Sequence, residues 1–451
     1  MHSKTPSTAL MAAQQAVSRV ISEAGRVGRT SRRSLLGGTL AASCVAVGPV
    51  PAGGLFAAGP QRLRIGLVGC GGRGTGAAQQ ALAADPSVHV VSLGDVFADQ
   101  VASAAEVLRR SSADQFACPP SAWFVGPDAC RQVIESGVDV VLLAAPPHVR
   151  PLHLELAVAA GKHVYCEKPV AIDAAGVVRA AAAAARGRAS GLALVSGFCF
   201  RRDARVVEMV ARIHDGAIGR TLAVHAHAAI GLPWRKPLDS SLADGSEAGF
   251  KTGLPAGSWP LRNWVSFNRF SGGHFVEHHV QAIDRAIWIL GDESPVLAEP
   301  LESGPAGAGP GFTASAGRPD NAATGAIGDC RAATAVRYMF ADGRTLEASL
   351  DRRERDSDRI VETAVGSAGR CDVARFAIAG TRAWTAEPAA GPSRFVATVG
   401  ALVRSILSGR VAHDGDTMCR STRVAVMGSL AAEAGRSVAW NELTEDASTL
   451  A

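Results

Sequence analysis

Apolar strand patterns and helical patterns alternate over the first part of the chain. Runs that predict strands lie at 63–68, 88–94, 138–144 and 192–196, and helical patterns lie between them at 77–84, 98–110, 128–136, 151–160 and 173–186. The run at 138–144 is apolar nearly throughout, as expected for a strand that is buried on both faces. This alternation predicts a parallel sheet with crossover helices, so residues 61–196 are expected to form an α/β Rossmann domain.

The pattern changes after Ser196. Alternating segments that predict strands lie at 221–229, 333–340, 345–351, 359–365 and 382–386, and helices are expected from Asp203 and at 394–408 and 417–434. Residues 231–258 and 302–328 are rich in glycine and lack periodicity, which predicts long loops. Residues 197–445 are therefore expected to form an α+β substrate-binding domain built on a large, mostly antiparallel sheet.

The first sixty residues precede this two-domain pattern. Arg32 and Arg33 stand before a mildly apolar run of small residues, an order typical of a twin-arginine export signal. The run is too short and too rich in glycine and alanine for a convincing membrane span. Residues 1–60 are thus expected to be a leader that directs the protein out of the cytoplasm and is its only membrane contact. A disordered basic tail is the alternative.

Glycines follow the first predicted strand. Gly69, Gly71 and Gly74 match the G-x-G-x-x-G spacing, in which the backbone approaches a pyrophosphate at a helix N-terminus. A simple tight turn is the alternative, but Asp95 ends the next strand where a carboxylate can bind the adenosine ribose. Because this carboxylate would repel a 2′-phosphate, the expected cofactor is NAD rather than NADP. The turn residues expected to bind it are Gly69, Gly71, Gly72, Arg73 and Gly74.

Composition sets limits on the function. Charged residues make up 19% of the 451 residues and the net charge of +5 is spread along the chain, so no nucleic-acid binding is expected. The nine cysteines are scattered and form no C-x-x-C pair, which indicates buried thiols. No metal site is therefore predicted.

Two later strand ends carry further candidate cofactor residues. The run at 138–144 leads into Pro146 and His148, and ligands bind outside the carboxyl ends of such strands. A solvated loop histidine is an equal alternative for His148. Glu167 and Lys168 follow in the segment GKHVYCEKP, and an ammonium group at a strand end can hold a hydroxyl and ease its deprotonation.

Together, the glycine turn, the Ala-Pro-Pro-His loop and the segment GKHVYCEKPVAID resemble the Gfo/Idh/MocA oxidoreductase family. The resemblance covers residues 62 to about 442. It implies hydride transfer between NAD(P) and a carbohydrate carbon, with Glu167 and Lys168 in the family's second signature. It also implies that Lys168 lies beside the nicotinamide and the reacting hydroxyl.

The segment SGGHFVEHHVQAIDRAIWILG, at 271–291, carries a polar helical face that includes Glu277, His278 and Gln281. An amphipathic helix alone would explain this pattern. In most of the family, by resemblance, this helix carries an aspartate and, four residues later, a histidine that acts as the base. Here Glu277 and Gln281 occupy those positions, and glutamine cannot accept a proton at neutral pH. Simple alcohol dehydrogenation is therefore in doubt.

The local sequence resembles a secreted branch of the family more closely. That branch carries an Arg-Asn-Trp motif, found here from Arg262, and a pattern that Glu277 and His279 match. The resemblance favours His279 as the catalytic histidine, whereas helical geometry favours His278, and both stay candidates. The residues expected to bind substrate are Arg201, Arg262, Asn263 and Trp264.

The expected function is an exported oxidoreductase that moves hydride to or from a hydroxyl carbon of a sugar, sugar acid or cyclitol. Its NAD would be retained and recycled, and its subunits are expected to associate through the C-terminal sheet. The expected catalytic residues are Lys168, Glu277, His278, His279 and Gln281. The alternative, which Gln281 favours, is a catalytically silent carbohydrate-binding or scaffold protein.

Overall fold

The computed structural model describes residues 62–236, 258–301, 327–352 and 358–445. All described residues belong to one compact unit. The predicted leader with Arg32 and Arg33 lies outside the described residues.

Six parallel strands form the first sheet, in the order β3-β2-β1-β4-β5-β6. Their bounds are β1 (Leu63–Val68), β2 (Val88–Asp95), β3 (Trp123–Val125), β4 (Val140–Leu143), β5 (His163–Cys166) and β6 (Leu194–Ser196). The strand order reverses between β1 and β4, and dinucleotides bind outside the carboxyl ends of strands at such a point. The predicted Rossmann fold is confirmed, although the sequence pattern misses β3, which is too short to show a period.

Helices cover both faces of this sheet. One face carries α2 (Gly72–Ala84), α3 (Ala98–Ser111) and α14 (Arg394–Leu407), and the other carries α4 (Ala129–Glu135), α5 (Arg150–Ala159) and α6 (Ala174–Ala189). Val399 and Leu402 of α14 share a core with Ile65 and Leu67 of β1. The chain therefore returns to the first sheet near its C-terminal end.

Nine strands form the second sheet, in the order β14-β13-β12-β11-β7-β10-β9-β8-β15. Neighbouring strands are antiparallel except β7 and β10, which are parallel, so the predicted mostly antiparallel sheet is confirmed. The bounds are β7 (Thr221–Ile230), β8 (Leu297–Pro300), β9 (Ala333–Met339), β10 (Thr345–Arg352), β11 (Arg359–Gly366), β12 (Gly369–Asp372), β13 (Ala377–Gly380), β14 (Trp384–Thr385) and β15 (Val438–Ala439).

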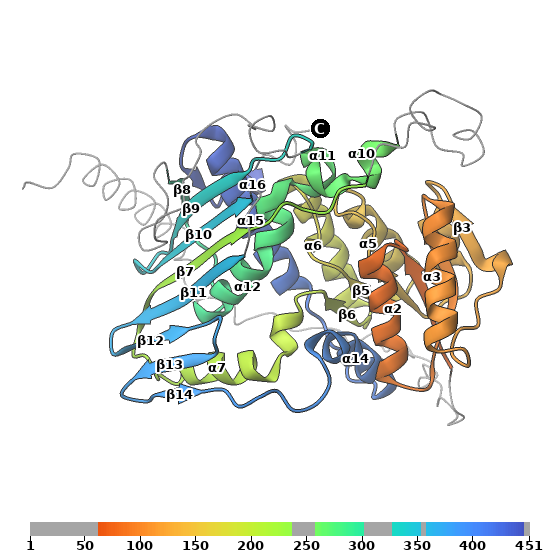
Figure 1. Cartoon of the computed structure of the whole chain (residues 1–451), viewed down its shortest axis with the longest axis horizontal. Coiled ribbons are helices and arrows are strands. Elements are labelled where there is room, and N and C mark those ends of the chain that lie inside the picture. Colours follow the sequence, from red (N-terminus) through yellow and green to blue (C-terminus); the bar gives the residue numbers. More distant parts are fainter. Residues whose placement is uncertain (1–61, 237–257, 302–326, 353–357, 446–451) are drawn as a thin grey trace, which may run out of the picture. The chain divides into compact units, whose positions relative to one another are not determined.

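Helices α12 and α15 lie along one face of this second sheet (Figure 1). The helices of this part of the chain are η2 (Cys199–Arg202), α7 (Ala204–His214), α10 (Trp259–Arg262), η3 (Trp264–Ser266), α11 (Asn268–Ser271), α12 (Val280–Ile289), α15 (Gly415–Ala434) and α16 (Glu442–Glu445). A short 3₁₀ turn, η1 (Pro120–Ala122), precedes β3 in the first domain.

The segment predicted as one helix at 271–291 is broken near its start. Gly272 and Gly273 have positive φ angles of 72° and 86°, and a Cβ on Gly272 would lie 3.0 Å from the Ile172 carbonyl oxygen. A π-helical turn, η4 (Phe275–His279), then leads into α12. Because a π-turn inserts an extra residue per turn, the side chains on either side of it do not keep the α-helical phase.

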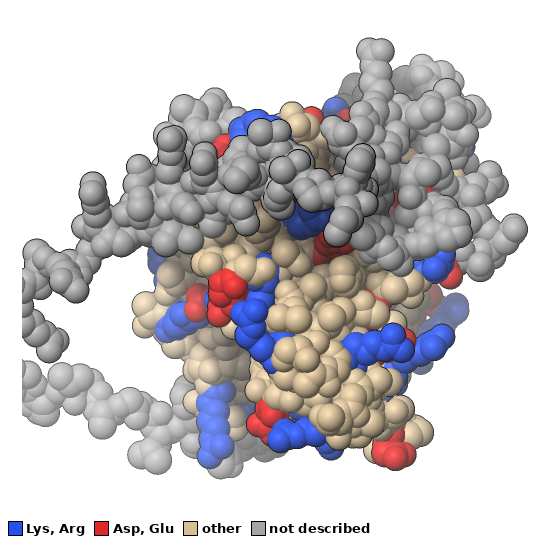
Figure 2. All heavy atoms as spheres, turned by 90° about the vertical axis from the view of Figure 1, so that its left-hand side faces the viewer, with Lys and Arg blue, Asp and Glu red and all other residues tan. Residues whose placement is uncertain are grey.

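The described surface mixes charges of both signs. On the face shown in Figure 2, lysine and arginine side chains are interspersed with aspartate and glutamate. Among the described residues, every helix is too short or too polar to cross a bilayer.

Candidate active site

The turn between β1 and α2 needs two of its glycines for packing. Gly69 has a φ of 92°, and a Cβ there would lie 2.4 Å from the Ala145 amide nitrogen. A Cβ on Gly74 would lie 1.8 Å from the Gly69 carbonyl oxygen. By contrast, a Cβ on Gly71 would approach only the Gln100 side chain, at 4.0 Å, and one on Gly72 would meet nothing. The start of α2 therefore faces open space, as a diphosphate-binding helix N-terminus does.

This open space is part of a cavity of about 600 Å³, within the usual range for ligand pockets. The predicted cofactor residues that line it are Gly69, Gly71, Gly72, Arg73, Gly74, Asp95, Pro146 and His148. The cavity also has walls that the sequence does not single out: His153 on α5 and the segment 234–236. Both could have been suspected, because His153 lies on the helix after the Pro146–His148 loop and 234–236 reads Trp-Arg-Lys in a long loop.

Asp95 is fixed at the end of β2. Its Oδ2 accepts the Cys70 N–H at 2.7 Å and its Oδ1 accepts the Phe97 N–H at 2.9 Å. Burial raises the pKa of this carboxyl, although the two amide hydrogen bonds oppose the shift. A carboxylate oxygen can accept more than one hydrogen bond, so both oxygens can still receive ribose hydroxyls.

The Arg-Asn-Trp motif lies at this nucleotide cavity. Arg262 and Trp264 line it, and Arg262 forms a two-pronged ion pair with Asp99 of α3 at 2.9 Å for each contact. The Arg262 guanidinium also stacks 4.0 Å from the Phe97 ring centroid and lowers the pKa of Asp99. Arg262, predicted to bind substrate, thus contacts the Rossmann domain beside the end of β2.

The other two residues predicted to bind substrate are held within the protein. Arg201 forms ion pairs with Asp284 at 3.0 Å and Asp292 at 2.7 Å. Asn263 is fully buried, and its side chain bonds to both the amide and the carbonyl of Lys236. These contacts position loops and helices, and neither side chain lines the cavity.

Lys168 and Glu277 meet although they are far apart in the sequence. Lys168 Nζ lies 2.8 Å from Glu277 Oε1 and 2.6 Å from the Glu277 carbonyl oxygen. Their side chains are only 17% and 10% exposed, and Glu277 Oε2 makes no hydrogen bond to any described residue. Burial raises the pKa of Glu277, while the positive charges of Lys168 and Arg150 oppose that shift.

Arg150 is a buried cation that the sequence analysis does not identify. It donates to the Ala145 carbonyl at the cavity wall and to the Pro169 carbonyl next to Lys168. It therefore ties the cavity wall to the turn that carries Lys168. An arginine at the start of the apolar helix at 151–160 is the signal that could have drawn attention to it.

Glu167 precedes Lys168 and holds the turn that carries it. It is buried, and its carboxylate accepts the Tyr165 hydroxyl at 2.8 Å and the Lys168 N–H at 3.1 Å. It also pairs with Arg73 of the glycine turn at 3.1 Å. Glu167 thus links the glycine turn to the end of β5 and does not line the cavity.

The two adjacent histidines point to different surroundings. His279 is buried and donates its Nε2–H to the Ala226 carbonyl of β7 at 2.8 Å. Burial lowers the pKa of His279 to about 4, so it stays neutral near pH 7. The pKa of His278 is lowered by burial and by the positive charges of Arg352 and Lys168, which places His278 in the electrostatic environment of Lys168. The two histidines thus differ: His279 bonds to β7, whereas the positive charge of Lys168 acts on His278.

Gln281 lies one turn further along, at the start of α12. Its Nε2 donates to the Gly197 carbonyl at 3.2 Å, and its Oε1 makes no hydrogen bond to a described residue. Gly197 in turn packs against Glu167, because a Cβ on Gly197 would lie 2.6 Å from Glu167 Oε2. Through Gly197, Gln281 therefore packs against Glu167, the residue that holds the Lys168 turn.

A dinucleotide-type Rossmann sheet followed by an α+β domain defines the class of this chain. Residues 63–190 match the Gfo/Idh/MocA model, described as an oxidoreductase family with an NAD-binding Rossmann fold. Residues 63–190 are therefore similar to the NAD-binding Rossmann domain of the Gfo/Idh/MocA oxidoreductase family.

The matched relatives are inositol dehydrogenases. The chain is 30% identical over 184 residues to inositol 2-dehydrogenase of Acidothermus cellulolyticus, which covers 40% of this chain and 50% of the relative. It is 32% identical over 167 residues to inositol 2-dehydrogenase of Gluconacetobacter diazotrophicus, and this match covers 36% of this chain and 45% of the relative. The chain thus spans about half the length of these relatives.

Solved structures share the fold over both domains. An aldose–aldose oxidoreductase from Caulobacter crescentus, complexed with glycerol, has a TM-score of 0.58 and 21% identity, covering 84% of this chain and 100% of its own. A levoglucosan dehydrogenase, in complex with NADH and levoglucosan, has a TM-score of 0.60 and 18% identity, and the match covers 84% of this chain and 99% of that enzyme. At these identities the likeness shows the fold.

Proposed function

We propose that this chain is an NAD-dependent oxidoreductase that transfers hydride to or from a hydroxyl carbon of a sugar, sugar acid or cyclitol. One observation carries the proposal: Lys168, in the turn after β5, lies 2.8 Å from Glu277. Arg150 links this turn to the wall of the nucleotide cavity through the Pro169 and Ala145 carbonyls. The names of the matched relatives and solved structures, which include inositol, aldose and levoglucosan enzymes, support a polyhydroxylated substrate.

The cavity residues fit NAD. The space left open at Gly71 suits a diphosphate, and Asp95 offers carboxylate oxygens for the ribose of the adenosine. A carboxylate at that position favours NAD over NADP, because it repels a 2′-phosphate. When bound, NAD supplies the hydride acceptor or donor.

The protein's own part in the reaction is to hold the reacting hydroxyl and move its proton. Lys168 Nζ uses two contacts on Glu277, so its third N–H can bind a substrate hydroxyl. Glu277 Oε2 makes no hydrogen bond to a described residue and can accept the proton of that hydroxyl. Because burial raises the pKa of Glu277 toward the working pH, it becomes a better proton acceptor than an exposed glutamate. His278 is the second candidate, and Gln281 serves in positioning.

Purified protein tests this proposal directly. Nucleotide released from it should be NAD, and at least one member of a panel containing myo-inositol, aldoses and aldonates should change the absorbance of bound NADH. Lys168→Ala should lower the turnover rate by about 10²–10⁴-fold with NAD binding unchanged. Lys162→Ala, at the other end of β5, is the matched control and should keep the parental rate.

Two outcomes would count against the proposal. A parental turnover rate in Lys168→Ala would remove Lys168 from the chemistry. A protein that retains NAD but oxidises or reduces no member of the panel would favour the silent carbohydrate-binding alternative, which Gln281 in place of the expected histidine supports.

Export is a further part of the proposal, supported by the paired Arg32 and Arg33. Twin-arginine export carries folded proteins, which suits an enzyme that leaves the cytoplasm with its nucleotide bound and recycles it. Changing both arginines to lysine should leave folded precursor in the cytoplasm. Equal export of the double variant and the parent would refute this part. Association through the C-terminal sheet is proposed as well, and light scattering of the purified protein tests it.

A further inference from the structure

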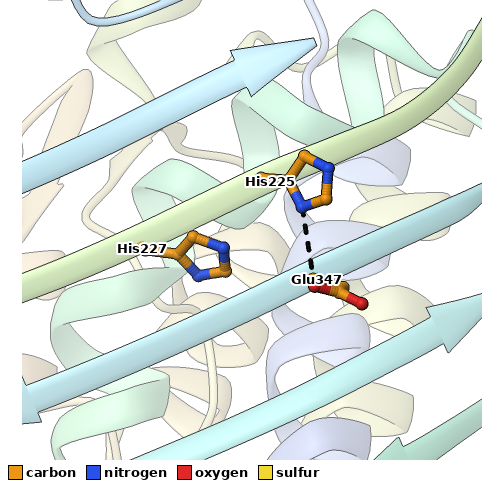
Figure 3. A group of neighbouring side chains, drawn as sticks. All are labelled: His225, His227 and Glu347. Carbon is orange, nitrogen blue, oxygen red and sulfur yellow. Dashed lines mark ion pairs between the residues drawn. The ribbon is translucent and has the colours of Figure 1, made fainter. Parts of the chain in front are cut away.

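Two histidines and a glutamate gather on the second sheet, apart from the Lys168–Glu277 pair. His225 and His227 lie two residues apart on β7, so their side chains point to the same face of the sheet. Glu347 of β10 is the direct partner of His225 in the parallel β7–β10 register. Figure 3 shows the three side chains converging in front of the strands, with helices behind the sheet. Val224 and Ala226, which alternate with the histidines, belong to the hydrophobic core.

The ligand atoms of these side chains are close enough to share one ion. One ligand atom from each residue lies within 4.8 Å of the other two. His225 Nδ1 lies 3.5 Å from Glu347 Oε2, and neither atom makes a hydrogen bond to a described residue. His227 and Glu347 are buried, whereas the His225 side chain is 27% exposed and leaves an approach for a small ion.

Neighbouring groups orient two of the three side chains. Arg337 donates two hydrogen bonds to Glu347 Oε1, at 2.7 and 2.9 Å, and leaves Oε2 facing His225. Ser349 Oγ lies 3.0 Å from His227 Nδ1. If Nδ1–H donates to that hydroxyl, Nε2 is the ring nitrogen that carries the lone pair. Outer partners of this kind fix the tautomer and direction of metal-binding side chains.

The chemistry of the three side chains also suits a metal ion. The donor set of two imidazoles and one carboxylate is the set that binds zinc with a fourth position left for water.

We propose that His225, His227 and Glu347 bind one divalent transition-metal ion of the zinc class. The ion would join β7 to β10, the two central strands of the second sheet. This reverses the sequence-based expectation of no metal, which considered cysteine pairs. A His-x-His pair on a strand, at 225–227, is the signal that the cysteine search passes over. The proposal does not depend on the proposed oxidoreductase activity.

Calorimetric titration of the chelator-treated, dialysed full-length protein with zinc chloride tests the site. The parent should bind one ion per chain. Zinc should also raise the melting temperature of the parent, because a ligand that binds only the folded state stabilises it. Cobalt chloride serves as a second probe, since cobalt bound to histidine nitrogen absorbs visible light.

Three variants locate the ion. His225→Gln and Glu347→Gln should each weaken zinc binding by at least ~10-fold and abolish the visible cobalt spectrum. Ser349→Ala keeps all three ligands and should weaken binding by about 10–100-fold, the usual effect of removing an outer partner. His214→Gln, an exposed histidine on α7, is the matched control and should bind like the parent.

The results separate a metal site from a simple ion pair. Absence of zinc binding by the folded parent would overturn the proposal, as would equal zinc affinity in the parent, His225→Gln and Ser349→Ala. If Glu347→Gln fails to fold because Arg337 loses its partner, His225→Gln and Ser349→Ala still decide the question, since neither removes a charged partner of Arg337.

Discussion

The Lys168–Glu277 pair makes a prediction about stability that does not require a known substrate. Both side chains are largely buried, so Lys168→Met leaves a buried carboxylate without its cation. Removing one partner of a buried pair costs about 3–5 kcal/mol. We expect a loss in the free energy of unfolding near the lower end, about 3 kcal/mol at pH 8, because Glu277 can escape part of the cost by taking a proton.

Because Glu277 can take a proton, the stability loss of Lys168→Met should depend on pH. Burial already raises the pKa of Glu277, and Lys168 opposes that shift, so losing Lys168 raises the pKa further. A group with a raised folded-state pKa loses stability as pH rises through that pKa, by up to about 1.4 kcal/mol per pH unit. Lys168→Met should therefore be closer to the parent at pH 6 than at pH 8.

Urea unfolding followed by circular dichroism measures these free energies. The double variant Lys168→Met/Glu277→Gln removes both charges and should recover at least about half of the loss, since no unpaired charge remains buried. Arg110→Met is the control: Arg110 pairs with Glu106 at 2.7 Å with 78% of its side chain exposed, and such pairs contribute about 1 kcal/mol or less. A double variant no more stable than Lys168→Met, together with a loss that does not depend on pH, would refute the buried pair.

Three further predictions concern the cofactor cavity and the buried histidines. Gly74→Ala should lower the melting temperature, because its Cβ would lie 1.8 Å from the Gly69 carbonyl oxygen. Gly71→Ala should melt like the parent but bind NAD more weakly in calorimetry. The reverse result would contradict the packing of the turn. Arg262→Gln should raise the dissociation constant for NAD more than the KM for sugar, since Arg262 lines the nucleotide cavity and pairs with Asp99; a change in KM alone would return it to substrate binding. Burial lowers the pKa of His279 to about 4, so its contribution to stability is present above pH 6.5 and is lost as pH falls toward 4, by up to about 3 kcal/mol. His279→Phe should therefore lose less stability than the parent between pH 7 and pH 4.5. Equal losses in thermal melts of the two proteins would count against this role.

The sequence alone predicts the Rossmann half well, because its determinants are local. The glycine spacing from Gly69 to Gly74 encodes backbone geometry directly, and Asp95 and His148 follow strands whose ends must meet at one edge of a parallel sheet. Part of the second sheet is also indicated locally, since β10 alternates apolar and polar residues along most of its length. Some strands of two or three residues, such as β3 and β15, carry too few positions to show a period.

Only the tertiary structure decides which side chains meet across the chain. Lys168 and Glu277 are 109 positions apart, and no local pattern predicts their contact. The π-turn at 275–279, which follows two glycines with positive φ, changes the helical phase, and His279 bonds to the Ala226 carbonyl of β7. Ion-pair partners have the same origin, because Arg262 contacts Asp99 only after the two domains fold together. Sequence periodicity specifies which face of an element is buried, whereas the pairing of polar groups depends on how those faces pack against one another.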